Sequence, residues 1–434
     1  MKTNFLVYCL LFFTVSFTPL KAQYIQYVKY VGAFGDEDWT RGWTNYKPNG
    51  IAYMPTNITL PNIIDKNTTL SKRNTYLLHA VVYVTNNAVL TIEPGTVIRG
   101  DFETCGTLVI TKGAKLVANG LETDPIIFTS NKSVGERKPG DWGGIIILGN
   151  AEINKLGGVS AIEYGIDSKY ALYGGNDDND NSGSLKYVRI EYPGNKISKD
   201  QELNGLTLAG IGKSTIVENV QVSYSNDDSF ETFGGTVNLK NIYSYRCTDD
   251  DFDFNFGYNG RVQFAVAYRH PLIGDFSGSR CIEADSYSGS KSTMDPSRKI
   301  SSFSVSNLTL VIADNINTTS SVAFCKEAVY VGKDCNLSLY NSVISGFKTG
   351  LFMKDENLKD KAIKNEVKIS NNVFNKCEKM FYTDINYDEI NTYYTNQSFK
   401  NRQVDYLVTD LFKDIFNVNF PDLRLKNKEL FDAK

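Results

Sequence analysis

Short apolar segments separated by glycine turns recur along this chain. Leu90–Ile98 is followed by the similar segment Leu108–Leu116, and each has an apolar stretch, a turn with glycine and a second apolar stretch. The apolar segments Ile126–Phe128 and Ile145–Leu148 continue the series. A short repeat built from strands predicts a solenoid, because one coil cannot bury its apolar face without its neighbours.

A second repeat, in the middle of the chain, has an asparagine at one fixed position. Three segments with apolar flanks carry Asn219, Asn241 and Asn307 at the same place. We call the separation between Asn219 and Asn241 the coil step, and Asn307 follows Asn241 after three such steps. Stacked asparagine side chains at a turn hydrogen-bond to one another along a solenoid axis. We expect Gln263 and Asp285 to fill the two intervening steps.

These repeats predict an all-β chain that forms a right-handed parallel β-helix, the pectin-lyase-like type of solenoid, with short coils of roughly 20 residues. The ends lack the repeat, and we expect them to cap the open strand edges. The predicted regions are a signal peptide, an N-terminal cap region, the β-helix and a C-terminal cap region, at residues 1–22, 23–75, 76–375 and 376–434. Within the last region, residues 404–416 are expected to form a short helix over the last coil.

The N-terminus has the pattern of a secretory signal peptide. Lys2 precedes the apolar run Phe5–Phe17, and Ala22 offers a small residue for cleavage. This run is too short to span a bilayer comfortably, and no later segment is apolar enough to do so. We therefore expect an exported protein in the periplasm, at the cell surface or outside the cell, with no transmembrane segment in the mature chain.

Charge and cysteine content narrow the classes of function. A net charge of −3 lacks the basic surplus of nucleic-acid-binding proteins, so we expect no nucleic acid partner. Six cysteines follow the signal peptide, and an even number permits disulfides in an exported chain. Cys325 and Cys335 are the favoured local pair, and buried free thiols in the core are an equally good interpretation.

Acidic residues also recur at the coil step. Asp227 is expected to stack on Asp249, Asp228 on Asp250 and Glu231 on Asp253, with Asp275 one step beyond. Carboxylates about 5 Å apart on adjacent coils repel one another unless bound Ca²⁺, raised pKa values or nearby arginines neutralise them. Arg246 and Arg269 precede the acidic segments and are candidates for the last role, whereas all seven acids are candidate calcium ligands.

The acidic ladder supports three interpretations: turn capping, which is favoured, a calcium site, and catalysis on a polysaccharide. The candidate catalytic residues are Asp228, Asp250, Asp253, Arg246, Arg269 and His270. The Gly-His-Gly and Arg-x-Lys motifs that accompany paired aspartates in some β-helix polysaccharide hydrolases are missing, which counts against hydrolysis. Gly174–Gly183 has the composition of a calcium loop without the terminal glutamate of an EF-hand, which favours a polar loop.

Long blocks of the sequence resemble a group of exported bacterial right-handed parallel β-helix proteins without an established activity. The blocks are 90–100, 106–120, 125–130, 139–149, 182–191, 204–208, 225–235 and 249–257. The resemblance implies the fold and a location in the cell envelope or outside the cell. We predict non-catalytic binding of a glycan or a cell-surface protein along the solenoid surface. The alternative is a polysaccharide-cleaving enzyme, a hydrolase or a calcium-dependent lyase, that uses the acidic ladder at residues 227–275.

Overall fold

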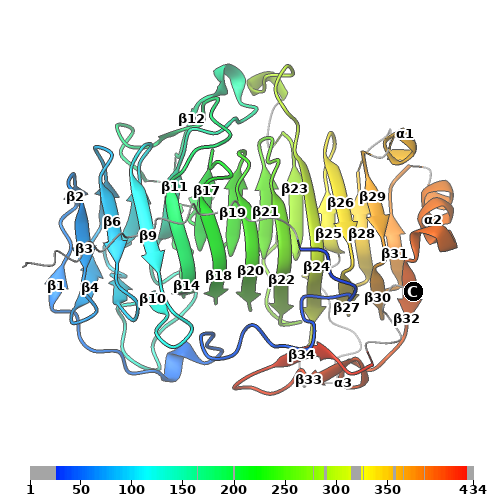
Figure 1. The fold of residues 1–434 in the computed structure, drawn as a ribbon, viewed down its shortest axis with the longest axis horizontal. Coiled ribbons are helices and arrows are strands. Elements are labelled where there is room, and N and C mark those ends of the chain that lie inside the picture. The colour runs from blue at the N-terminus through cyan, green and yellow to red at the C-terminus, as the bar shows by residue number, and fades with distance from the viewer. Residues whose placement is uncertain are drawn as a thin grey trace, which may run out of the picture.

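A computed structural model describes residues 26–427 apart from 164, 199–200, 277, 288–290, 314–323, 326, 355–357, 365 and 386. The predicted signal peptide lies outside the described residues. The chain winds into a right-handed parallel β-helix whose strands stack along the long axis of the molecule (Figure 1). Two large parallel sheets form its walls, which confirms the predicted fold.

Sheet B, the smaller wall, has eleven strands, one from each successive coil. They are β2 Ile63–Ile64, β5 Val81–Val84, β8 Thr107–Ile110, β11 Gly144–Leu148, β17 Leu206–Ala209, β19 Phe230–Phe233, β21 Phe252–Asn255, β23 Ile282–Asp285, β25 Glu327–Val331, β28 Thr349–Met353 and β31 Lys379–Tyr382. Apolar side chains at alternate positions point into the solenoid, where Phe230 stacks on Phe252 with ring centroids 5.4 Å apart. Each such buried aromatic or aliphatic side chain contributes roughly 1.5–3 kcal/mol of transfer free energy.

Sheet A, the larger wall, has seventeen strands and folds around a bend that gives each coil two sides in this sheet. The strands are β1 Ile58–Thr59, β3 Thr68–Leu70, β4 Thr75–Leu78, β6 Val89–Ile92, β7 Val97–Gly100, β9 Lys115–Asn119, β10 Ile126–Ser130, β14 Gly183–Glu191, β18 Ile216–Ser223, β20 Asn238–Tyr245, β22 Arg261–Arg269, β24 Ser302–Ile312, β26 Asn336–Tyr340, β27 Val343–Ser345, β29 Lys368–Ser370, β30 Val373–Asn375 and β32 Arg402–Val404. The first half of β14 pairs with β9 and its second half with β10.

The asparagine ladder marks this bend. Asn219, Asn241, Asn307 and the later Asn341 have positive φ angles of 56°, 52°, 56° and 51°. Asparagine tolerates this left-handed conformation better than other residues with a Cβ, so it allows a strand to turn the corner without breaking. Along the axis, Asn371 Nδ2 donates a hydrogen bond to Asn341 Oδ1 at 2.7 Å, as the repeat predicts.

The register departs from the sequence repeat in two places. Leu90 pairs with Leu116 and not with Leu108, because the sequence match aligned different sides of consecutive coils. The residues at the bend on three successive coils are Asn241, Phe264 and Asn307, because β20 pairs with β22 and β22 pairs with β24. Gln263 therefore lies one residue before the bend. Asp285 belongs to sheet B, where it pairs with Asn255.

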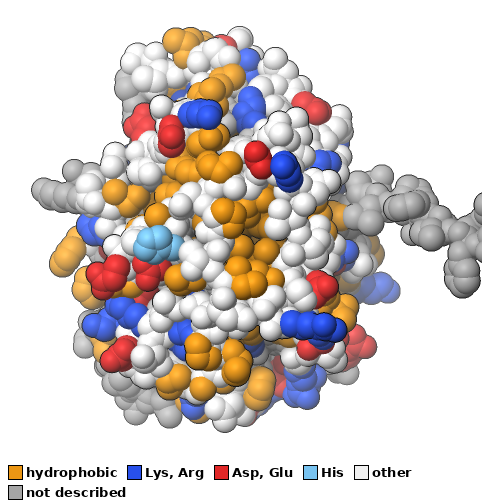
Figure 2. Space-filling view, turned by 90° about the vertical axis from the view of Figure 1, so that its left-hand side faces the viewer, with side chains coloured by type: hydrophobic (Ala, Val, Ile, Leu, Met, Phe, Trp, Pro, Cys, Tyr) orange, Lys and Arg blue, Asp and Glu red, His pale blue; other side chains and the backbone are white. Residues whose placement is uncertain are grey.

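Residues 26–57, expected to cap the first coil, run instead along the side of the solenoid (Figure 1). Gln26 N donates to Gln263 Oε1 at 2.7 Å, and Asn45 N donates to Gln221 Oε1 at 2.8 Å. The segment includes the 3₁₀ helix η1, Pro48–Gly50. The end of the solenoid at the first coil shows a band of hydrophobic side chains (Figure 2), with Ile63 42% exposed.

The opposite end of the solenoid is covered by helix α2, Tyr387–Thr395, which packs on β31 through its buried Tyr394. Residues 404–416, predicted as a helix over the last coil, form only the short helix α3, Val408–Leu411, followed by strand β33, Phe412–Asp414. They lie along the side of sheet A, where Leu411 and Phe412 join a cluster with Tyr268. The remaining elements are α1 Leu358–Ile363, β12 Ser160–Ala161, β13 Leu172–Tyr173, β15 Lys196–Ser198, β16 Gln201–Glu202, β34 Asp422–Leu425, η2 Leu156–Gly158, η3 Lys291–Thr293 and η4 Gln397–Phe399.

Candidate functional site

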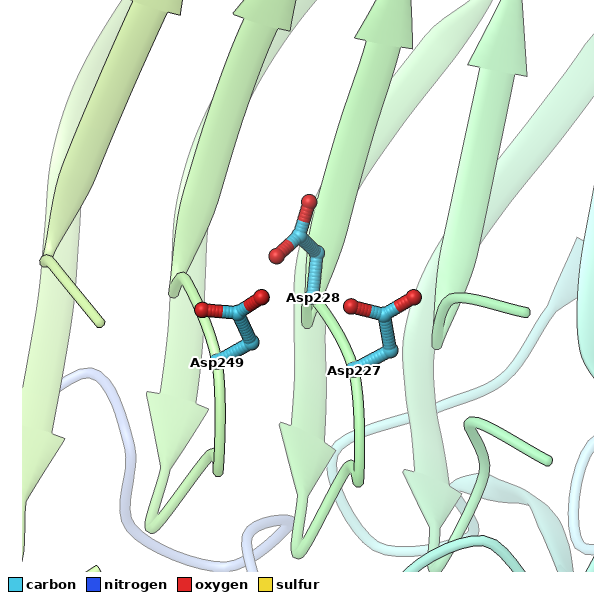
Figure 3. Close-up of side chains that lie close together, drawn as sticks. All are labelled: Asp227, Asp228 and Asp249. Atoms are coloured by element: carbon cyan, nitrogen blue, oxygen red, sulfur yellow. The ribbon is translucent and has the colours of Figure 1, made fainter. Parts of the chain in front are cut away.

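Two acidic turns stack on each other where the chain enters β19 and β21. Asp250 N donates a hydrogen bond to Asp228 Oδ1 at 2.9 Å, and Ser229 N donates to the backbone oxygen of Asp250 at 3.0 Å. Figure 3 shows Asp227 and Asp249 on equivalent turns of neighbouring coils, with Asp228 between them. The predicted stacking of the first two acid pairs is therefore present.

The acids continue onto the outer face of sheet B. Glu231 pairs with Asp253 in the strand register, as predicted, and Asp253 pairs with Glu283. Glu283 thus takes the place predicted for Asp275, because the intervening coil is longer than the coil step. Asp275 lies in the loop after β22, where its Oδ1 accepts hydrogen bonds from Gly278 N and Ser279 Oγ.

The acidic cluster is defined here as Asp227, Asp228, Glu231, Asp249, Asp250 and Asp253. Four of these side chains are nearly buried: Asp228, Glu231, Asp250 and Asp253 are 4–9% exposed. Burial is the main cause that raises the pKa of Asp228 well above its ordinary value, and repulsion by Asp227 and Asp250 adds to it. Burial likewise raises the pKa values of Asp227, Glu231, Asp250 and Asp253.

The carboxylate oxygens of the acidic cluster converge in two overlapping groups. One oxygen each of Asp227, Asp228 and Asp249 lie within 4.8 Å of one another, and so do oxygens of Asp228, Glu231 and Asp253. Oxygens on opposite sides of one Ca²⁺ ion are separated by about 5 Å, twice a bond of about 2.4 Å. The spacing therefore suits a shared cation of this size.

Amide side chains surround these carboxylates without satisfying all of their oxygens. Asn204 Nδ2 donates to Glu231 Oε2, and Asn255 Nδ2 donates to Asp253 Oδ2 at 2.5 Å. Among the described residues, Asp253 Oδ1 and Asn255 Oδ1 are buried without a hydrogen-bond partner. Buried oxygen atoms left in this way are costly, and a bound cation is one means of satisfying them.

The predicted basic partners lie elsewhere. Arg269 is fully buried inside the solenoid, where its Nη1 pairs with Asp251 Oδ2 at 2.8 Å. Arg246 packs over the ring of Tyr245 at 5.4 Å, and none of its described contacts is with the acidic cluster. His270 follows β22, and its Nδ1 accepts a hydrogen bond from Leu272 N at 3.1 Å. The prediction that Arg246 and Arg269 neutralise the ladder is wrong.

Among the described residues, Arg280 is a cation at this rim, and the repeat did not single it out. Its backbone N–H donates to Asp250 Oδ1, and its guanidinium pairs with Glu283 and approaches Glu327 at 3.8 Å. Asn204, Asn255 and Arg280 were missed because they lie outside the repeat that identified the acids. The acid stretch Asp249–Asp253 already contained Asp251, whose inward position is set by the turn before β21, because strand alternation from Asp253 would place it on the outer face.

Thiols surround the buried Arg269–Asp251 pair. Arg269 Nε donates to Cys325 Sγ at 3.2 Å, and burial raises the pKa values of Cys247 and Cys281 well above the ordinary thiol value. The six cysteines of the described part of the chain are all free. The predicted Cys325–Cys335 disulfide is therefore wrong, and the alternative of buried thiols is confirmed.

A small cavity borders the cluster at the far ends of β19 and β21. It has a volume of about 140 Å³ and is lined by Phe233, Phe256, Tyr173 and the polar side chains of Lys155, Ser160 and Glu163, with Ala161 and Ile162. Lys155 Nζ lies 3.9 Å from the centre of the Phe256 ring. Burial lowers the pKa of Lys155, and Glu163 opposes this shift.

The polar loop Gly174–Gly183 is tied to its surroundings by protein contacts. Asp178 pairs with Lys299 at 2.5 Å, and Asp180 Oδ2 accepts a hydrogen bond from Ser182 Oγ at 2.8 Å. Neither of the two acid groups that converge closely enough for a metal ion among the described residues includes this loop. The calcium ligands proposed below are therefore taken from the acidic cluster.

Comparison with models of protein families agrees with this architecture. No curated protein and no solved structure matches the chain. Among the described residues, none of the helices is long and apolar enough to cross a membrane. The model of a pectate-lyase-like β-helix domain matches residues 62–407, which include all but the first strand of the two large sheets. Membership of this family supports a glycan-related role in general terms. The chain belongs to the family of pectate-lyase-like β-helix domains.

Proposed function

We propose that this chain is an exported protein that binds a glycan along the outer face of sheet B without cleaving it, and that the acidic cluster holds Ca²⁺ at this face. The observation that carries the proposal is the convergence of buried carboxylate oxygens within 4.8 Å of one another in two groups. The similarity of the fold is the reason for proposing a glycan ligand, and the geometry of the acidic cluster is the reason for proposing the cation.

Calcium fits the chemistry of the donors. The ligands on offer are hard carboxylate and amide oxygens, without a thiol or imidazole among the residues that converge, and this set suits Ca²⁺ better than Zn²⁺. Ca²⁺ takes six to eight oxygen ligands, so three or four protein carboxylates leave positions for hydroxyl or carboxylate oxygens of a sugar. The buried Asp253 Oδ1 and Asn255 Oδ1 would also gain a partner.

Binding is favoured over cleavage because the guanidinium groups of the described arginines near the cluster are engaged in other contacts. Arg269 is held inside the solenoid by Asp251, and Arg246 packs on Tyr245. Arg280 is engaged with Glu283 and Glu327 at the rim. A lyase needs a base at the reacting carbon, and a guanidinium committed to ion pairs is poorly placed to serve as one.

Cleavage of the glycan by the same cluster is the second candidate. The observation that favours it is the approach of Asp228, Glu231 and Asp253 oxygens within 4.8 Å, since paired carboxyl groups are what acid–base cleavage of a glycosidic bond requires. Release of reducing ends from a polysaccharide, lost in Asp250→Asn while folding is kept, would establish this second function in place of the first.

The calcium proposal is tested by thermal unfolding of the mature chain. Saturating Ca²⁺ at about 100 times its Kd is expected to stabilise the folded state by about 2.7 kcal/mol, and EDTA should remove the gain. Asp228→Asn, which changes the residue shared by both oxygen groups, should abolish the response. Asp65→Asn, at an exposed turn of the first coil, is the matched control. A melting temperature indifferent to Ca²⁺ and EDTA would leave the cluster as a turn-capping feature.

The glycan part is tested by electrophoresis of the mature chain through gels that contain soluble polysaccharides, with Ca²⁺ or with EDTA. Retardation without release of reducing ends is the expected result. If no polysaccharide retards the chain in either condition, the proposed glycan-binding function is wrong, whatever the outcome of the calcium test.

A further inference from the structure

We propose that three aromatic side chains beyond the acidic cluster form stacking subsites for an uncharged linear polysaccharide that lies along the solenoid axis. The inference rests on the proposed function and deepens it. One outward row of sheet B runs Glu231, Asp253, Glu283 and then Tyr330, Phe352 and Tyr382 in continuous strand register. We call Tyr330, Phe352 and Tyr382 the aromatic row.

The rings of the aromatic row come from successive coils, and their planes are inclined to one another by 74° and 50°. The ring centroids of Tyr330 and Phe352 are 5.4 Å apart, and those of Phe352 and Tyr382 are 5.2 Å apart. Strand spacing sets this distance, which is close to the length of one sugar residue in an extended chain. All three side chains are half-buried, so each ring is held by its neighbours and still reaches the surface.

The aromatic row continues directly from the acidic cluster. Burial raises the pKa of Tyr330, and the nearby carboxylates of Asp285 and Glu283 add to this shift. Arg280 links the two parts, because it pairs with Glu283 and lies 4.4 Å from the centre of the Tyr330 ring. A chain bound at the cluster would therefore meet the first ring without leaving the face.

The shape of the row favours a polysaccharide over a protein. Two positions further along these strands stand Asp285, Gly332, Lys354 and Asp384, so glycine and charged residues border the apolar row on this side. A stable protein interface needs about 800 Å² on each partner, with a wide apolar centre. Aromatic faces bordered by hydrogen-bonding groups instead suit a narrow ligand with apolar ring faces and polar edges, as a pyranose has.

The charges beside the rings argue for an uncharged glycan. Lys379 lies 4.1 Å from the centre of the Tyr382 ring, and Arg280 is offset by Glu283 and Glu327. Both signs of charge thus lie beside the row, so no single sign of charge selects an acidic or a basic sugar. The same groups supply donors and acceptors for hydroxyls.

The test is electrophoresis of the mature chain through gels containing mixed-linkage β-glucan, galactomannan or polygalacturonate. Phe352→Leu and Tyr382→Leu keep apolar packing and remove the ring, and each is expected to weaken binding of an uncharged polysaccharide about tenfold. Tyr340→Leu, a half-buried tyrosine on sheet A, should leave binding unchanged. The calcium-dependent shift in melting temperature should be the same in all three variants, which shows that the cluster and the fold are intact.

Three results would overturn the inference. Wild-type retardation by polygalacturonate alone would show an acidic ligand, and would leave the proposed glycan-binding function standing. Equal retardation of wild type and both ring variants in β-glucan or galactomannan would place the sugar elsewhere on the solenoid. No retardation by any of the three polysaccharides would contradict both the inference and the proposed function, even if calcium still raised the melting temperature.

Discussion

Asp250 and Asp251 are consecutive residues before β21, yet they have opposite partners. Asp251 points into the solenoid, is 0% exposed and pairs with the equally buried Arg269. Asp250 points outward to the acidic cluster, where its nearest charged neighbours include Asp249, Glu283 and Asp253. Burial raises the pKa of both carboxyl groups, but Arg269 opposes the rise at Asp251, whereas repulsion by Asp249, Glu283 and Asp253 adds to the rise at Asp250.

This difference distinguishes Asp251, a structural carboxylate, from Asp250, a candidate metal ligand. Inside the solenoid the chain supplies its own counter-charge, and Ser244 Oγ also donates a hydrogen bond to Asp251 Oδ1 at 2.5 Å. On the outer face the carboxylates are gathered against their mutual repulsion, and Arg280 is the rim cation that their described contacts identify. Among the described residues of this face, carboxylates outnumber the cations that pair with them, an arrangement that a divalent cation would offset.

Arg269→Met is expected to cause the largest loss. Removing one partner of a fully buried pair leaves Asp251 without its counter-charge, which costs about 3–5 kcal/mol of unfolding free energy. Urea denaturation measures the change. Arg261→Met, at the exposed start of the same strand, should change stability by less than about 0.5 kcal/mol. Adding Asp251→Asn to Arg269→Met should recover part of the loss, and a single variant as stable as wild type would contradict the comparison.

The second prediction concerns pH in the presence of EDTA. The pKa values of Asp227, Asp228, Glu231, Asp250 and Asp253 are raised in the folded chain. The folded state therefore holds more protons than the unfolded state above the ordinary aspartate value of 3.8. This contribution to stability is fully present below that value and is lost as pH rises through the folded pKa values. The melting temperature should fall as pH rises from about 4 to about 8.

Asp228→Asn isolates the cluster in the pH experiment. The variant removes one titrating group and relieves repulsion on its neighbours, so its melting temperature should fall less steeply with pH than that of wild type. Ca²⁺ should also flatten or reverse the wild-type slope, because it binds the ionised carboxylates. Parallel pH profiles for wild type and variant would mean that the cluster does not hold its protons as described.

The fold was predictable from the sequence because each coil of a solenoid repeats a similar pattern of apolar segments and turn residues. Asn219 and Asn241 were recognisable as equivalent since both bends demand a left-handed residue. Phe264 occupies the same conformation, with φ of 58°, and no composition rule points to a phenylalanine there. The repeat also could not show that residues 26–57 return along the side of the coils, because contacts such as Gln26 with Gln263 span 237 positions.

The candidate site was predictable only as far as the coil length stayed constant. The coil step taken from the asparagine repeat placed Glu231 on Asp253 correctly. The next coil is longer, so the same step pointed to Asp275 in a loop when Glu283 was the residue in register. Arg246 and Arg269 were chosen as partners of the acids because they lie close to the acidic segments in the sequence, and this choice was wrong. Which arginine faces the acids depends on strand alternation and turn geometry, and these assign Arg269 to the interior and Arg280 to the rim.

The smallest expected effect separates the two arginines directly. Arg280→Met removes a rim cation whose side chain is 17% exposed and which pairs with Glu283 and Glu327. Because solvent screens these pairs, the loss should be about 1 kcal/mol or less, well below that of Arg269→Met, and 1 M salt should reduce it further. In Ca²⁺ the variant should lose still less, since the ion replaces the missing positive charge beside Asp250. Urea denaturation at low and high salt measures both effects. If Arg280→Met cost as much as Arg269→Met in Ca²⁺, the cluster would depend on an internal counter-charge as the interior does, and the distinction between Asp250 and Asp251 would fail.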